Sequence, residues 1–122
     1  MLKSELPYIV LAYIGDVVFE LRVRNFFIKG KKFSDIREIH RKVVDVVNGQ
    51  RQATFLRELK ENTLNSEELE FVRRVRNHKS SGRKHIERES TGFEALLGYL
   101  YDNSPERLDF ILDKVEAMYS DD

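Results

Sequence analysis

The chain has 122 residues and a mass of 14.4 kDa, enough for one hydrophobic core and too little for two, so we expect one domain over residues 1–122. Hydrophobic residues make up 41% and charged residues 34%, an ordinary balance for a soluble globule. The absence of cysteine excludes a disulfide scaffold, a thiolate metal site and a cysteine nucleophile, and it favours a cytoplasmic protein.

The net charge is zero, but the charged residues are unevenly distributed. Residues 22–42 hold eight Lys or Arg against two acids, and residues 73–88 hold seven against one. Residues 101–122 hold seven acids against two bases. The two basic blocks could therefore bind a polyanion although the whole chain is neutral. We expect no membrane association, because there is no secretory signal pattern and no apolar run long enough to cross a bilayer.

The first predicted element is a helix over residues 7–28, with Pro7 in its first turn. Between residues 8 and 19 only Gly15 and Asp16 are not apolar, so we expect a helix buried on most of its surface. A buried carboxylate is tolerated only when it is paired, hydrogen-bonded or bound to a metal. Asp16 is therefore the first candidate functional residue.

A second helix is predicted to follow Asp35, which has the spacing of a capping box with Glu38. The pair at residues 48–49, Asn-Gly, is typical of a left-handed C-terminal cap and predicts the end of this helix. A third helix is predicted over residues 50–60, where apolar residues recur at helical spacing.

A fourth helix is predicted from a second possible capping box, formed by Asn65 and Glu68, to about Arg76. The following residues, 77–89, contain scarcely any apolar side chain, which predicts a solvated loop.

A fifth helix is predicted over residues 91–102, where Glu94 is the only charge before residue 102 among apolar residues and two glycines. Ser104-Pro105 is a strong start signal for a sixth helix. No segment alternates with the period of a strand and there is no internal repeat, so the sequence predicts an all-α fold of about six helices.

Two helices that each carry a lone acid suggest that Asp16 and Glu94 meet. Gly15 and Gly98 would let the two backbones approach closely. Carboxylate oxygens suit Mg²⁺, or Mn²⁺ as a substitute, and two acids are enough for such a cation. A cation held in this way can activate water and stabilise the charge on a phosphodiester. The three histidines lie in polar surroundings, so the sequence assembles neither a zinc site nor a nucleophilic triad.

Three segments resemble the Mini-III ribonucleases, relatives of ribonuclease III that lack a double-stranded-RNA-binding domain. They are LAYIGDVVFELRVR at residues 11–24, VRNHKS at 75–80 and STGFEALLGYLY at 90–101. The resemblance implies a homodimer of all-helical subunits, with an RNA duplex across the dimer and two Mg²⁺-dependent sites that each cut one strand. It also implies 5′-phosphate and 3′-hydroxyl ends, and a role in maturing the large-subunit ribosomal RNA precursor in the bacterial cytoplasm. Asp16 and Glu94 align with the catalytic acids of that family.

Ordinary ribonuclease III carries two further acids at the positions of Ala12 and Thr91. Their absence, which Mini-III members share, leaves the number of metal ions open. Glu20, one turn after Asp16, is a candidate for a supporting oxygen.

The basic block near residue 80 is the best candidate for phosphate contacts, because its charge is too concentrated for an ordinary solvated surface. The predicted RNA-contact residues are Arg76, Asn77, Lys79, Arg83 and Lys84, with His40 and Lys42 on the second helix as further candidates.

Several alternatives remain open at this point. Glu94 could form only a capping box with Thr91, and Asp16 could form a structural ion pair, for instance with Arg22 or Arg24. The whole chain could be a non-catalytic helical RNA-binding or ribosome-assembly module. It could also be a protein–protein interaction dimer, in which case it would show no salt-dependent affinity for RNA.

Overall fold

The computed structural model describes residues 5–29 and 35–120, which form six α-helices and a short 3₁₀ helix and contain no strand. The all-α prediction is therefore confirmed. The helices are α1 (Tyr8–Ile28), α2 (Ile36–Val47), α3 (Gly49–Asn62), α4 (Ser66–Asn77), α5 (His85–Asn103) and α6 (Pro105–Tyr119), and the 3₁₀ helix is Lys79–Ser81. None of the described helices has the length and apolar character needed to cross a membrane.

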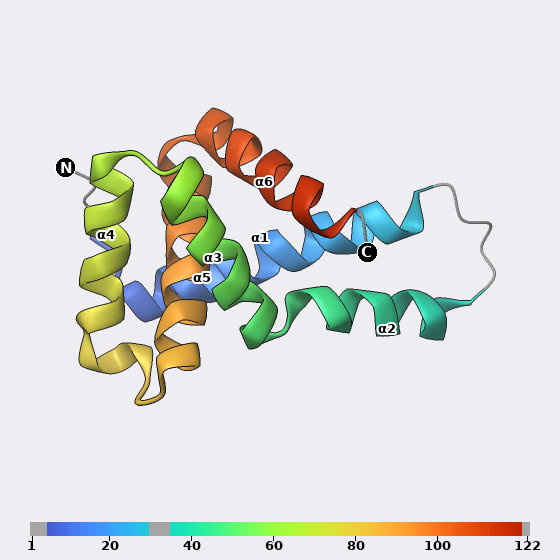
Figure 1. Ribbon diagram of the computed structural model, residues 1–122, viewed down its shortest axis with the longest axis horizontal. Coiled ribbons are helices and arrows are strands. Elements are labelled where there is room, and N and C mark those ends of the chain that lie inside the picture. Colours follow the sequence, from blue (N-terminus) through green and yellow to red (C-terminus); the bar gives the residue numbers. More distant parts are fainter. Residues whose placement is uncertain (1–4, 30–34, 121–122) are drawn as a thin grey trace.

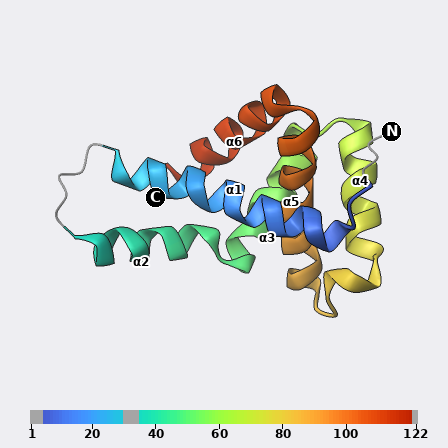
Figure 2. The same cartoon turned by 180° about the vertical axis from the view of Figure 1, so that it is seen from behind.

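Helix α5 lies at the centre of the molecule (Figure 1). Helix α1 crosses it on one face, as Figure 2 shows, while α3 and α4 pack against it from the other side. Helix α2 runs back along the C-terminal half of α1, and α6 packs over the end of α5. The buried apolar side chains form one cluster, in which Phe19 of α1 meets Phe93 of α5 edge to face at 5.0 Å between ring centroids.

The cap signals in the sequence were partly correct. The capping box is present at α4, where Asn65 accepts from the backbone N–H of Glu68 at 2.9 Å and Glu68 accepts from that of Asn65 at 3.0 Å. The left-handed cap at residues 48–49 is wrong, because Gly49 is already the first residue of α3 and Asn48 is its N-cap. The Asn48 side chain accepts from the backbone N–H of Arg51, which turns the chain directly from α2 into α3.

The solvated loop predicted over residues 77–89 is only partly correct, because most of these residues are exposed but much of the segment is helical. A 3₁₀ helix follows α4, capped by His78, whose Nδ1 accepts from the backbone N–H of Ser80 at 3.1 Å. Helix α5 begins at His85, six residues before the predicted start at residue 91. Its first turns are rich in polar residues because most of them face solvent, whereas Glu89 is buried against basic side chains.

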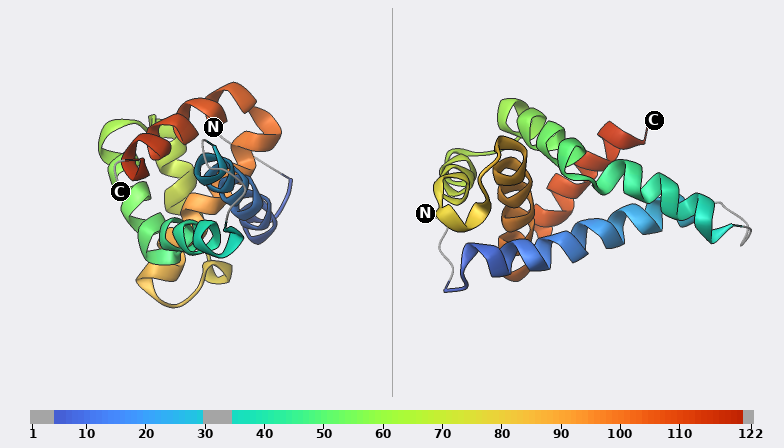
Figure 3. Two further views of the ribbon diagram at one scale, coloured as in Figure 1. Left: turned by 90° about the vertical axis from the view of Figure 1, so that its right-hand side faces the viewer. Right: turned by 90° about the horizontal axis from the view of Figure 1, so that it is seen from below.

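Helix α1 is not buried on most of its surface, contrary to the sequence expectation. Figure 3 shows α1 along one edge of the molecule, with its outer side uncovered by other helices. Large apolar side chains occupy this side, and Tyr13 is 77% exposed. Apolar composition predicted burial, but it does not distinguish a side of the helix that faces the core from one that faces solvent.

Candidate active site

Two glycines bring the backbones of α1 and α5 into contact. A Cβ atom at Gly15 would lie 1.7 Å from the carbonyl oxygen of Glu94, and one at Gly98 would lie 1.9 Å from that of Leu11. Both distances are far too short for any side chain, so only glycine fits at either position. The predicted close approach is therefore confirmed, and it brings the residue after Gly15 next to Glu94.

The side chains of Asp16 and Glu94 meet at this crossing and share a hydrogen bond. Asp16 is exposed and Glu94 is half-buried, so the pair is open to solvent on the Asp16 side. Burial, together with the hydrogen bond and charge of Asp16, raises the pKa of Glu94 to about 8, and a hydrogen bond from Gln52 acts in the opposite direction. Without a cation, the Glu94 carboxyl group therefore tends to keep its proton near neutral pH.

The donor set fits a hard divalent cation. A cation bound by Asp16 and Glu94 would offset the repulsion between the two side chains and favour the ionised form of Glu94. Among residues 5–29 and 35–120 there is no cluster of three or more His, Cys, Asp or Glu side chains that could hold a metal. Two carboxylates suit Mg²⁺ or Mn²⁺, which commonly keep several water ligands and bind substrate phosphate. The same set does not suit zinc, which prefers nitrogen and sulfur ligands.

Thr91 does not contribute to the acid pair. Its hydroxyl donates to the carbonyl oxygen of Ser81 at 3.2 Å, which ties α5 to the 3₁₀ helix. Because α5 begins at His85, Thr91 lies inside the helix and cannot be its N-cap. The alternative in which Glu94 serves only as part of a capping box with Thr91 is therefore excluded.

The alternative of a structural ion pair for Asp16 is not supported by the positions of the two arginines considered. Arg22 binds Glu116 of α6 at 2.8 Å. Arg24 binds Glu20 at 2.7 Å, one turn away on its own helix. This ion pair also engages Glu20, the residue considered as a supporting oxygen for the site.

The sequence analysis did not predict a role for Gln52, which contacts Glu94 on the buried side of the acid pair. Gln52 is 2% exposed, and its Nε2 donates to Glu94 Oε2 at 3.4 Å. A signal for it was present, because Gln52 has helical spacing with Phe55, Leu56 and Leu59 and thus lies on the inward face of α3. A polar residue on a buried face needs a hydrogen-bond partner, and here that partner belongs to the candidate site.

The predicted RNA-contact residues near residue 80 differ in accessibility. The exposed ones are Asn77, Lys79, Arg83 and Lys84. Arg76 is half-buried and forms an ion pair with Glu89, which Lys60 also binds at 3.1 Å. These interactions neutralise the buried Glu89 carboxylate and anchor the start of α5 to α3 and α4.

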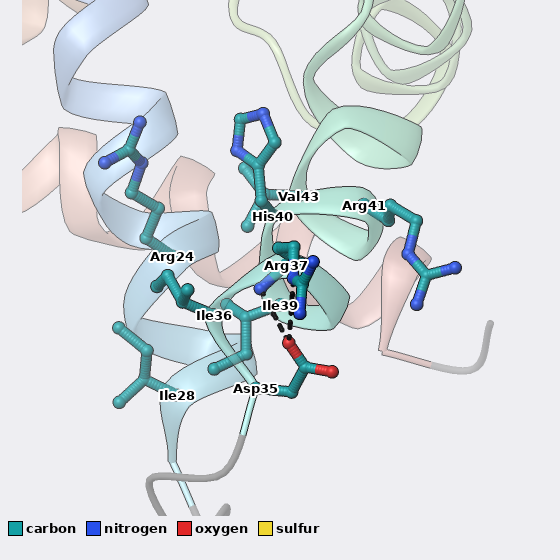
Figure 4. A pocket seen from close by; sticks show the side chains of 9 residues that line it. All are labelled: Arg24, Ile28, Asp35, Ile36, Arg37, Ile39, His40, Arg41 and Val43. Atoms are coloured by element: carbon teal, nitrogen blue, oxygen red, sulfur yellow. Dashed lines mark hydrogen bonds and ion pairs between the residues drawn. The ribbon is translucent and has the colours of Figure 1, made fainter.

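The two candidates on α2 lie apart from the acid pair. His40 is exposed and lines a groove of about 850 Å³ between α1 and α2 (Figure 4). Lys42 is half-buried and pairs with Glu38 at 3.6 Å. The groove is lined by Arg24, Ile28, Asp35, Ile36, Arg37, Ile39, His40, Arg41 and Val43. It is thus separate from Asp16 and Glu94, neither of which lines it.

Comparison with known proteins identifies the relatives of this chain. The profile of the Ribonuclease III domain matches residues 9–105. A Mini-ribonuclease 3 of Clostridium tetani is 38% identical over 119 residues, which cover 93% of this chain and 78% of that protein. One from Thermosynechococcus vestitus is 41% identical over 108 residues, covering 85% and 70%. The crystal structure of a Fusobacterium nucleatum protein matches with a TM-score of 0.76 and 25% identity, covering 92% of this chain and 93% of that one.

Proposed function

Because the chain belongs to the ribonuclease III family, in its Mini-III group, and is an endoribonuclease, we propose that it cleaves double-stranded RNA at the pair formed by Asp16 and Glu94. The observation that carries this proposal is the convergence of these two acids at a solvent-open helix crossing. Residues 1–122 would act as one catalytic domain.

Enzymes of this family use divalent metal ions, and the proposed cofactor is Mg²⁺, with Mn²⁺ as a substitute. The cation would supply positive charge to the phosphodiester and would activate water for in-line attack. Asp16, the exposed acid, would face the approaching RNA. Glu94 accepts a hydrogen bond from the buried Gln52. Attack of water on phosphorus with the 3′ oxygen as leaving group yields the proposed 5′-phosphate and 3′-hydroxyl ends.

The exposed basic residues near the start of α5 are proposed to bind the RNA backbone. Lys79, Arg83 and Lys84 are free to reach phosphates from this surface, and Asn77 adds a neutral donor beside them. Arg76 would contribute the guanidinium N–H groups that its ion pair leaves available. A-form RNA presents mainly its shape, phosphates and 2′-hydroxyls, so selectivity would come from helix geometry.

His40 and Lys42 are proposed as additional backbone contacts on α2. Their helix runs alongside the C-terminal half of α1, so they would extend the contact surface away from the acid pair. Lys42 already interacts with Glu38, and an ion pair that is partly open to solvent is weak enough to be exchanged for a phosphate.

A homodimer through α1 is part of the proposal. Ile9, Tyr13, Val17 and Leu21 recur every four residues and are 51%, 77%, 60% and 59% exposed. A contiguous apolar stripe of this kind marks an interaction surface. A second copy related by a two-fold axis would bury the same stripe on both chains. Asp16 precedes Val17 directly, so both active sites would border the interface, where each could cut one strand of one duplex.

The proposed substrate is the precursor of the large-subunit ribosomal RNA, processed in the bacterial cytoplasm. This assignment rests on the resemblance to Mini-III ribonucleases. Duplex geometry and local irregularity, more than base identity, would select the cut position.

The test is to incubate the purified protein with duplex RNA with and without Mg²⁺. We expect shortening of the RNA only with the cation, loss of cleavage in Asp16→Asn, and full cleavage in the control Asp109→Asn, which alters an exposed aspartate on α6. RNA that is shifted in a gel but never shortened would indicate the non-catalytic RNA-binding alternative. Cleavage by folded Asp16→Asn at the wild-type rate would remove the site assignment.

A further inference from the structure

The side-chain amide of Gln52 is almost fully buried, and both its nitrogen and its oxygen form hydrogen bonds. Its Nε2 donates to the carbonyl oxygen of Val47 at 2.9 Å and to Glu94 Oε2 at 3.4 Å. Its Oε1 accepts from the hydroxyl of Ser90 at 2.6 Å. Burying an amide without partners is costly, so these bonds fix the side chain in one position. Gln52 thereby connects the end of α2 with α3 and α5.

The carbonyl oxygen of Val47 determines which end of the amide faces Glu94, because this oxygen can only accept a hydrogen bond. If the amide were turned over, its oxygen would face two acceptors, the carbonyl of Val47 and the Glu94 carboxylate. Ser90, whose hydroxyl can donate or accept, holds the oxygen end of the amide in the observed orientation. The observed orientation satisfies all three neighbours at once. Ser90 lies one helical turn before Glu94 on α5, so the two residues that bind the Gln52 amide from α5 are neighbours on one face of that helix.

We propose that Gln52 and Ser90 are positioning residues, which hold the Glu94 carboxylate in the orientation in which it binds the metal together with Asp16; this inference rests on the proposed function above. Glu94 reaches the site from a half-buried position on a long, rotatable side chain. A donor fixed on α3 restricts that rotation. The carbonyl of Val47 orients the amide, and Ser90 limits its movement by binding the opposite end. Partners that orient metal ligands in this way commonly contribute 10- to 100-fold to metal affinity.

The competing explanation is purely structural, because the bond from Gln52 to Val47 also closes the corner between α2 and α3. A residue with only that role would lower thermal stability when replaced and leave metal affinity unchanged. Direct metal binding in the absence of RNA therefore separates the two roles, and Mn²⁺ is a suitable probe because it can be followed by electron paramagnetic resonance and by calorimetry.

The experiment compares wild type with Gln52→Met, Ser90→Ala and the double variant. Methionine keeps the length of the side chain but removes its hydrogen bonds. We expect Gln52→Met to bind Mn²⁺ about tenfold more weakly, since 3.4 Å is a long hydrogen bond and favours the lower end of the usual range. Ser90→Ala should weaken binding by a smaller factor. The double variant should be no weaker than Gln52→Met, because Ser90 acts only through Gln52.

The control is Glu68→Gln, which disturbs another buried polar residue, 2% exposed and bound to Arg107 at 2.7 Å. It should lower the melting temperature and leave Mn²⁺ affinity at the wild-type value. Wild-type affinity in folded Gln52→Met would overturn the proposal. If Gln52→Met does not fold, Ser90→Ala decides alone, and wild-type affinity in that variant overturns the proposal as well.

Asp16→Asn separates this inference from the proposed function on which it rests. This variant removes a proposed ligand directly and should bind Mn²⁺ far more weakly than wild type. If Asp16→Asn loses affinity while Gln52→Met keeps it, only the positioning role fails. If Asp16→Asn itself binds Mn²⁺ as tightly as wild type, the metal site fails, and the inference about Gln52 fails with it.

Discussion

Replacing Glu94 by glutamine should stabilise the metal-free protein at pH 8, although it removes a proposed metal ligand. Burial and the neighbouring Asp16 raise the pKa of Glu94 from 4.5 to about 8 in the folded chain. The unfolded chain releases this proton at a lower pH than the folded chain does. The contribution of Glu94 to the free energy of unfolding is therefore fully present below about pH 4.5 and is lost as the pH rises towards 8.

The size of the effect follows from this pKa difference. One pKa unit corresponds to about 1.4 kcal/mol, so a rise from 4.5 to about 8 sets a ceiling of roughly 5 kcal/mol. Because Asp16 is exposed, water and salt screen part of its repulsion with Glu94. We therefore expect Glu94→Gln to gain about 1–3 kcal/mol at pH 8 and less than about 1 kcal/mol at pH 5. At this chain length each kcal/mol raises Tm by about 3–5 °C.

The assay is thermal unfolding of wild type and Glu94→Gln in EDTA at pH 5 and pH 8. The control Glu68→Gln removes a buried carboxylate whose partner is the cation Arg107, and it should lower Tm. Adding Mg²⁺ at pH 8 should raise Tm for wild type, because the folded state binds the ion, and leave Glu94→Gln nearly unchanged. A Glu94→Gln protein that is less stable than wild type at pH 8, or equally stabilised at both pH values, would refute the reasoning.

Three further variants test other parts of the structure. Gly98→Ala should destabilise the protein by about 3 kcal/mol or more in denaturant unfolding, because the added Cβ would lie 1.9 Å from a backbone carbonyl oxygen. Its control is Gly49→Ala, which should be tolerated because the nearest atom to the added Cβ lies at 3.5 Å. If the proposed α1 dimer exists, Tyr13→Asp should convert it to monomer in sedimentation velocity without lowering helix content. A dimer that persists in this variant would exclude the α1 interface. The double variant Arg83→Ala, Lys84→Ala should weaken binding to duplex RNA in EDTA. It should also reduce the slope of the logarithm of the binding constant against the logarithm of the salt concentration by about two, and an unchanged slope would argue against both contacts.

The sequence predicted helices well where local signals define their ends. Asn65 and Glu68 cap α4 as their spacing indicates, and Pro105 begins α6. The prediction failed at the start of α5, because the apolar pattern there is weak and the helix is held by contacts from elsewhere in the chain. Glu89 is buried against Lys60 and Arg76, and no local pattern reveals such a pairing.

The candidate site was predictable in part for the same reason. A lone acid in an apolar helix is visible in a sequence, and so is a glycine beside it, which is why Asp16 and Glu94 could be paired in advance. Gln52 was not predicted, because a single polar residue on the inward face of a helix indicates only that it has some hydrogen-bond partner. Its identity depends on how α3 packs against α5, which the sequence alone does not specify.

The sequence of helix α1 is almost continuously apolar because apolar side chains occupy both its core-facing side and its solvent-facing side. Leu11 and Phe19 point into the core, whereas Tyr13 and Val17 point outward. Asp16 lies at the boundary between these faces, where α5 contacts the helix backbone. In the proposed dimer the partner would therefore lie beside each acid pair and form one wall of the channel for RNA. Dilution into the monomer should then reduce cleavage per chain while helix content stays unchanged, even though both proposed catalytic acids belong to one chain. A loss of helix content together with cleavage would instead indicate a dimer needed only for stability.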